Sequence, residues 1–175
     1  MLSIPSKIGT YAIYIHLPRS KDITIGKLGR FNFPLGAYIY VGSAFGSGGL
    51  HPRLERHIYG SSCSHWHIDY LRRNAEVRAF CYLINNQNYE CRWVQALSEL
   101  SGSYFPVPGF GSSDCHKCQS HLIAIKYTDV TECQTMYNER LLVTIQDTLT
   151  MITELPPISI KCLQIPSQHD SCVPQ

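Results

Sequence analysis

The chain has 175 residues, of which 44% are hydrophobic and 16% are charged, and its formal net charge is +2. This length suffices for one buried core, and the composition is that of an ordinary globular protein. The chain contains no run of about 18 apolar residues, and its first residues, MLSIPSKIG, lack the charged start and apolar stretch of a secretory signal. We therefore expect a soluble, cytoplasmic protein with no membrane partner.

Eight cysteines are spread along the chain, at positions 63, 81, 91, 115, 118, 133, 162 and 172. A secreted disulfide scaffold is normally shorter and richer in cysteine, and intracellular thiols stay reduced. We therefore expect these cysteines to be free, buried or bound to metal.

The charge is distributed unevenly. Residues 1–73 hold nine Lys and Arg against three Asp and Glu, together with five of the eight histidines. A basic half of this kind attracts phosphate groups. The alternative is a solvated basic face that has no partner.

The first 42 residues predict an antiparallel sheet. Residues 10–17 place Tyr11, Ile13, Ile15 and Leu17 on one face, which is typical of a strand. The stretch DITIGKLGRFNF has two short apolar runs separated by glycines, and GAYIYVGS is a further strand. This pattern favours a meander of strands connected by hairpins.

Three helices are expected between residues 50 and 102: one over LHPRLERHIY, a short one within SCSHWHIDYLRR, and one over YECRWVQALSEL. Their expected start and end signals are Pro52 and Gly60, then Ser62 or Ser64, then Asn88 and Gly102. The stretch EVRAFCYLI, between the second and third helices, is expected to be a strand.

Beyond the third helix, SYFPVPGFGSSDCHKCQS has the composition of a loop, and HLIAIKYT is expected to be a strand. Residues 135–154 are expected to form one more helix. From Pro156 onward the chain is rich in proline and serine and shows no period, so we expect it to be irregular or disordered.

Three short motifs follow one another on the expected strands and first helix: GTY at residues 9–11, YVG at 40–42 and RLERH at 53–57. With Glu90 at the start of the third helix, they resemble the GIY-YIG nuclease superfamily. The stretches IGKLGRFNFPLGAYIYVGSA, HWHIDYL and PVPGFGSSDC look like one uncharacterised branch, whose members are sometimes fused to base-excision glycosylases.

The resemblance implies an α/β (α+β) fold with a small, mostly antiparallel sheet flanked by helices. It covers residues 8–128, so we expect a nuclease-like domain at 1–128 and a C-terminal extension at 129–175. The gap between Tyr11 and Tyr40 is longer than the usual spacing, which indicates an inserted hairpin at about residues 21–34.

The resemblance also implies roles for individual residues. Tyr11 would be the general base, with Tyr40 and His57 assisting, while Arg53 would hold the phosphate and Glu90 would bind Mg²⁺ or Mn²⁺. As an alternative, tyrosines in strands commonly pack against helices, and an acid in the first turn of a helix favours the helix dipole. Arg56, Arg30 and Lys27 are candidate contacts to a nucleic-acid backbone.

A second candidate metal site lies in CHKCQSH, where Cys115, Cys118 and His121 offer ligands at a spacing that zinc sites use. His65 and His67 could complete the set. The alternative is that hydrogen bonds to carbonyl or carboxylate groups satisfy these histidines.

The sequence therefore predicts a metal-dependent endonuclease that acts on DNA, with RNA left open as a substrate. One alternative is a module of the same fold that binds nucleic acid without cleaving it. The other is a structural domain stabilised by zinc.

Overall fold

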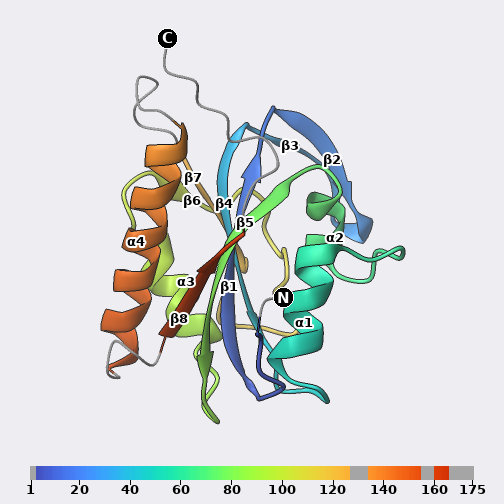
Figure 1. Ribbon diagram of the computed structural model, residues 1–175. Coiled ribbons are helices and arrows are strands. Elements are labelled where there is room, and N and C mark those ends of the chain that lie inside the picture. The colour runs from blue at the N-terminus through green and yellow to red at the C-terminus, as the bar shows by residue number, and fades with distance from the viewer. Residues whose placement is uncertain (1–2, 127–133, 155–159, 166–175) are drawn as a thin grey trace.

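The computed structural model describes residues 3–126, 134–154 and 160–165, and these residues form a sheet with helices on both faces (Figure 1). The described sheet has six strands in the spatial order β6-β7-β4-β1-β5-β8, and all neighbouring strands are antiparallel. The strands are β1 (Gly9–Leu17), β4 (Gly36–Ser43), β5 (Glu76–Ile84), β6 (Ser103–Tyr104), β7 (Leu122–Ile125) and β8 (Ile160–Gln164). The α/β fold with a mostly antiparallel sheet is confirmed.

Strand β1 lies between β4 and β5, and all of its residues are buried. Tyr11 and Ile13 belong to one hydrophobic core, whereas Ala12 and Tyr14 belong to another on the opposite face. Side chains alternate along a strand, so β1 contributes to both cores. This double burial explains why the segment is apolar or aromatic at most positions.

Helices cover both faces of the described sheet (Figure 1). The helices are α1 (Leu50–Tyr59) and α2 (His67–Arg72) on one face, and α3 (Glu90–Ser98) and α4 (Gln134–Thr153) on the other. Leu50 and Leu54 of α1 are fully buried, as their four-residue spacing predicts. Helix α1 ends at Gly60, which adopts a left-handed φ of 84° and donates its N–H to the carbonyl of Arg56.

The hairpin expected at residues 21–34 is present, but it forms a sheet of its own. Strand β2 (Lys21–Ile25) pairs with β3 (Gly29–Phe33) across a short 3-10 turn, η1 (Gly26–Leu28), while β4 pairs directly with β1. The first 42 residues therefore do not form one continuous meander. Instead, β2 contacts α2, and Ile25 and Phe33 are buried in the core on that face.

Helix α2 begins later than the sequence predicts. Its N-cap residue is Trp66, not Ser62 or Ser64. The Asp69 carboxylate accepts hydrogen bonds from the backbone N–H groups of His65 at 2.8 Å and Trp66 at 3.0 Å. An acid in the first turn, rather than a serine before it, thus satisfies free N–H groups at this helix start.

Residues 160–164 form strand β8, although irregular structure was expected from Pro156 onward. Pairing with β5 places Cys162 directly opposite Cys81, and the two form a disulfide with Cα atoms 4.0 Å apart. The expectation that all cysteines are free, buried or metal-bound is therefore wrong for this pair. Its half-cystines are 81 residues apart, so only the strand register reveals that they meet.

The helix expected at residues 135–154 is confirmed by α4, whose Leu142, Ile145 and Leu149 are buried in the second core. The expected domain boundary between residues 128 and 129 lies outside the described residues. Within the described segments, no helix combines the length and hydropathy needed to cross a membrane.

Candidate active site

A cavity of about 470 Å³ brings together side chains from β1, β4, α1 and α3. Tyr11, Tyr40, Arg53 and Glu90, which the sequence singles out, all line it. The rest of its lining comes from Gly42, Ser43, His65, Trp66, His67, Asn88, Gly111, Ser113, Asp114, Cys115 and His121. A volume of this size lies in the range of small-molecule and cofactor sites.

The glycines that flank the two tyrosine motifs are explained by close approach. Gly42 lies opposite Tyr11 in the β1–β4 register, and a Cβ atom added to it would lie 2.5 Å from the Tyr11 hydroxyl. A Cβ atom on Gly9 would lie 2.1 Å from the Leu83 carbonyl oxygen. Neither position has room for a side chain, so glycine permits both the strand pairing and the placement of Tyr11.

We expect Gly42→Ala to lower the free energy of unfolding by about 1–3 kcal/mol, because the added methyl group overpacks against the Tyr11 ring. Gly46→Ala is the matched control, since a Cβ atom there meets nothing within 4 Å. Urea denaturation of both variants measures the difference. Equal stability of the two variants would contradict the close approach of Gly42 and Tyr11.

Tyr11 is hydrogen-bonded to the helix that carries Arg53. Its hydroxyl lies 3.0 Å from Nε2 of His57, and both residues are buried. Burial raises the pKa of Tyr11, and the Glu90 carboxylate adds to this, whereas the Arg53 guanidinium acts to lower it. Burial also lowers the pKa of His57 to about 3, so this imidazole is neutral at physiological pH.

The ring of Tyr40 also contacts His57, with ring centroids 5.9 Å apart, and it contacts Phe110 as well. Burial raises its pKa well above the ordinary value. Gly111 allows this packing, because it adopts a left-handed φ of 72° and a Cβ atom there would lie 2.8 Å from the Tyr40 ring. Both tyrosines are therefore neutral phenols in the structure described here.

Arg53 and Arg56 both contact the ring of Trp66, with guanidinium carbons 4.5 Å and 4.6 Å from its centroid. Arg56 also makes an ion pair with Asp69 at 2.7 Å and donates to the carbonyl of Cys63. The structure thus places Arg56 between α1 and the segment before α2, whereas Arg53 lines the cavity. Trp66 supports both cations, a role that the sequence did not reveal.

Glu90 begins α3, whose N-cap residue is Tyr89 and not the predicted Asn88, although the backbone N–H of Glu90 donates to the side chain of Asn88 at 2.8 Å. Its carboxylate lines the cavity, accepts a hydrogen bond from the Ser43 hydroxyl at 3.3 Å, and lies 3.4 Å from Nδ1 of His121. A carboxylate has about four lone-pair sites, so Glu90 retains capacity for a cation.

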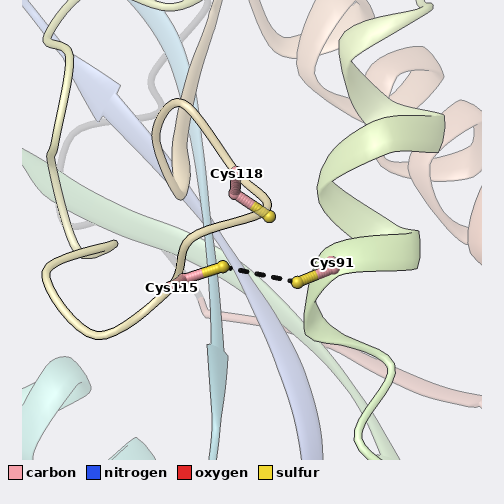
Figure 2. A group of neighbouring side chains, drawn as sticks. All are labelled: Cys91, Cys115 and Cys118. Atoms are coloured by element: carbon pink, nitrogen blue, oxygen red, sulfur yellow. Dashed lines mark hydrogen bonds between the residues drawn. The ribbon is translucent and has the colours of Figure 1, made fainter.

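Cys115 and Cys118 lie together, as the sequence predicts, but their third partner is Cys91 of α3 (Figure 2). The three sulfur atoms lie within 4.8 Å of one another, so this cluster could hold a metal ion. His121 lies beside Cys115, and burial acts against its proton, but Glu90 and Cys115 raise the pKa of His121 overall. The predicted ligand His121 is not among the atoms that lie within 4.8 Å of one another, and neither are His65 and His67, which line the cavity.

The remaining candidate residues lie on the β2–β3 hairpin. Arg30 is exposed and pairs with Asp22 at 3.0 Å, and Lys27 belongs to η1. Neither residue lines the cavity. The described structure therefore does not bring Arg30 and Lys27 into the group of residues that line the cavity.

The structure is thus an α/β domain in which the candidate catalytic residues come from strands β1 and β4 and from helices α1 and α3. Residues 10–142 match the model of the family described as "Domain of unknown function DUF123", and the chain belongs to this family. The match includes every candidate site residue. No curated protein and no solved structure matches the chain.

Proposed function

We propose that the protein is a divalent-metal-dependent endonuclease of the GIY-YIG type that hydrolyses DNA. One observation carries this proposal: Tyr11, Tyr40, Arg53 and Glu90 come from four different elements and line one cavity. If these four residues had only structural roles, nothing would require their side chains to meet at one site. Their convergence on one concave site supports shared chemistry.

Arg53 is the residue suited to the phosphate. Its guanidinium is always charged and presents a fixed fork of donors that matches phosphate oxygens. Stacking on Trp66 holds the guanidinium carbon 4.5 Å from the ring centroid. Arg53 would therefore meet the phosphate in a fixed orientation and stabilise the charge that develops on it during hydrolysis.

Tyr11 is suited to take a proton from an attacking water. In the tautomer that leaves Nε2 of His57 unprotonated, the Tyr11 hydroxyl donates to His57. The hydroxyl proton of Tyr11 would pass to this nitrogen as the Tyr11 oxygen accepts a proton from the water, so that Tyr11 stays neutral and His57 carries the proton. The carboxylate of Glu90 helps to raise the pKa of Tyr11. With that carboxylate neutralised by a bound cation, the pKa of Tyr11 would fall, which favours the passage of its hydroxyl proton to His57.

Glu90 is the residue that would hold Mg²⁺ or Mn²⁺. Its carboxylate is the single acidic group at this end of α3 and faces the cavity. Mg²⁺ commonly binds through one or two carboxylates and keeps several waters or phosphate oxygens as further ligands. A cation bound there would stabilise negative charge on the phosphate and the leaving oxygen.

DNA is the proposed partner because the N-terminal half is basic and Arg53 of that half lines the cavity. Arg53 also lines a neighbouring hollow with Arg56, Ser61 and Trp66. Arg30 and Lys27 on the hairpin would add contacts farther along the backbone. Such contacts position a nucleic acid without specifying its bases.

The test is cleavage of labelled duplex, single-stranded, nicked, flapped and branched DNA, and of matching RNA, with Mg²⁺, Mn²⁺ or EDTA. We expect the parent protein to cut DNA only with a cation. Glu90→Gln should bind DNA normally but cleave it at least about 100-fold more slowly, since metal stabilisation is worth several kcal/mol. Glu99→Gln, an exposed acid at the end of the same helix, is the matched control.

Salt-sensitive binding by the parent protein without cleavage under any of these conditions would contradict the nuclease proposal. It would favour a module that binds nucleic acid without cutting it. Preferential cutting of RNA would retain the nuclease and change its substrate.

A further inference from the structure

The three-cysteine cluster joins two parts of the chain that secondary structure does not connect. Cys91 lies in the first turn of α3, whereas Cys115 and Cys118 lie in the segment of residues 105–121 between β6 and β7. Figure 2 shows the three side chains pointing toward one another across the gap between helix and loop. The Sγ atoms of Cys91 and Cys115 are 3.5 Å apart.

These distances fit tetrahedral zinc. With Zn–S bonds of about 2.3 Å, sulfur ligands in a tetrahedron lie about 3.8 Å apart. The three Sγ atoms already lie within 4.8 Å of one another, so small side-chain adjustments would suffice. Thiolates select soft or borderline cations, whereas Mg²⁺ and Mn²⁺ prefer oxygen ligands. The cluster is therefore chemically distinct from the Glu90 carboxylate.

His121 is a nitrogen donor that lies beside Cys115 but outside the group of sulfur atoms within 4.8 Å of one another, so it would move toward them to bind the same ion. It is 2% exposed, and neither ring nitrogen has a hydrogen-bond partner of good geometry, although Nδ1 lies 3.4 Å from Glu90. Buried polar groups normally have partners. A zinc-bound histidine commonly directs its second nitrogen to a carboxylate, and Glu90 supplies one.

The segment of residues 105–121 has reason to need such an anchor. Loops longer than about 12–15 residues are uncommon inside compact domains unless they are functional. Backbone hydrogen bonds connect parts of the 105–121 segment to each other. The N–H of Gly109 donates to the carbonyl of Gln119, and the N–H of His121 donates to the carbonyl of Phe110, both at 2.8 Å. The cysteine cluster would tie it to α3.

We propose that Cys91, Cys115 and Cys118 bind one zinc ion, with His121 as the fourth ligand, and that this ion fixes the 105–121 segment against α3. Gly111, Cys115 and His121 of this segment line the cavity. The ion would therefore hold one wall of the cavity in place. This inference does not depend on nuclease activity.

The first test is metal content and thiol reactivity of the full chain. We expect the purified protein to carry about one equivalent of zinc, and chelation to expose three additional reactive thiols, because each of the three cysteine ligands is bound as a thiolate in the complex. Cys91→Ser should retain less than about one fifth of the zinc. Cys63→Ser, which replaces an exposed cysteine outside the cluster, should retain all of it.

Cobalt substitution tests the ligand set without relying on activity. The Co²⁺ protein should show thiolate-to-metal charge transfer and the strong visible bands of tetrahedral coordination, and His121→Ala should weaken those bands and the affinity for zinc. Absence of zinc from the parent protein even after refolding with it, or undiminished zinc in Cys91→Ser, would overturn the site. An unchanged cobalt spectrum in His121→Ala would overturn the assignment of the fourth ligand.

Discussion

Tyr11→Phe is expected to reduce DNA cleavage by about 100-fold to 10,000-fold, the range over which a general base contributes to a rate. The substitution removes one oxygen atom and keeps the ring that packs beside Gly42. It leaves His57 without the partner that lies 3.0 Å from its Nε2. We expect kcat to fall while DNA affinity stays near that of the parent protein, because Arg53 remains in place.

Single-turnover cleavage with excess protein measures this effect separately from product release. The control is Tyr14→Phe, the same change on the same strand, because Tyr14 is buried in the core on the opposite face. It should cleave like the parent protein. If Tyr11→Phe cut DNA at the parental rate, Tyr11 would not be the general base. The metal role of Glu90 would still be tested separately by Glu90→Gln.

Asp69→Ala is expected to lower the free energy of unfolding by roughly 2–4 kcal/mol. Asp69 is 7% exposed and accepts hydrogen bonds from Arg56 and from two backbone N–H groups that precede α2. Its loss leaves these donors without their acceptor and removes the first-turn acid of the helix. Urea denaturation at pH 7 measures the change.

Asp22→Ala is the matched control for this prediction. Asp22 also accepts hydrogen bonds from an arginine and from a second donor, but its pair with Arg30 is exposed on both sides. Exposed ion pairs contribute about 0–1 kcal/mol. If both variants lost the same stability, the Arg56–Asp69 contact would not be the structural link between α1 and α2 that the fold indicates.

The stability difference for Asp69 should also depend on pH. Burial acts to raise the pKa of Asp69, but hydrogen bonds from Arg56, Trp66 and His65 outweigh it and lower the pKa below the ordinary 3.8. A carboxylate with a lowered pKa contributes stability above the unfolded pKa and loses it as the pH falls through the folded value. The gap between the parent protein and Asp69→Ala should therefore shrink below pH 3.8.

The sequence predicted the elements whose signals are local. Strand β1 alternates between two cores, and α1 carries Leu50 and Leu54 on one face and ends at Gly60, so periodicity and a glycine were sufficient. Strand β8 could not be found in this way. The segment IKCLQ is short and partly exposed, and only its pairing with β5, which lies far away in the sequence, defines it as a strand.

In the candidate site, too, residues with local sequence signals were predicted, whereas residues defined by long-range contacts were not. The motifs identified Tyr11, Tyr40, Arg53 and Glu90 because they recur at recognisable positions on strands and helices. Cys91 was missed as a partner of Cys115 because no spacing links a helix to a loop 24 residues later. The roles of Trp66 and Asp69 could not be predicted, because they arise from contacts with arginines of α1 that only the folded chain reveals.

Strand β8 also shows that the described part of the sheet extends beyond the family match. The family match stops at residue 142, within α4, whereas the sheet continues to Gln164. A protein truncated after residue 142 would expose the edge of β5, remove Ile160 and much of α4 from the second core, and leave Cys81 without its disulfide partner. The edge of the described sheet is the five-residue β8. Without it, the nine-residue β5 would become the edge and offer a longer template for pairing with another chain, so we expect the truncation to promote self-association.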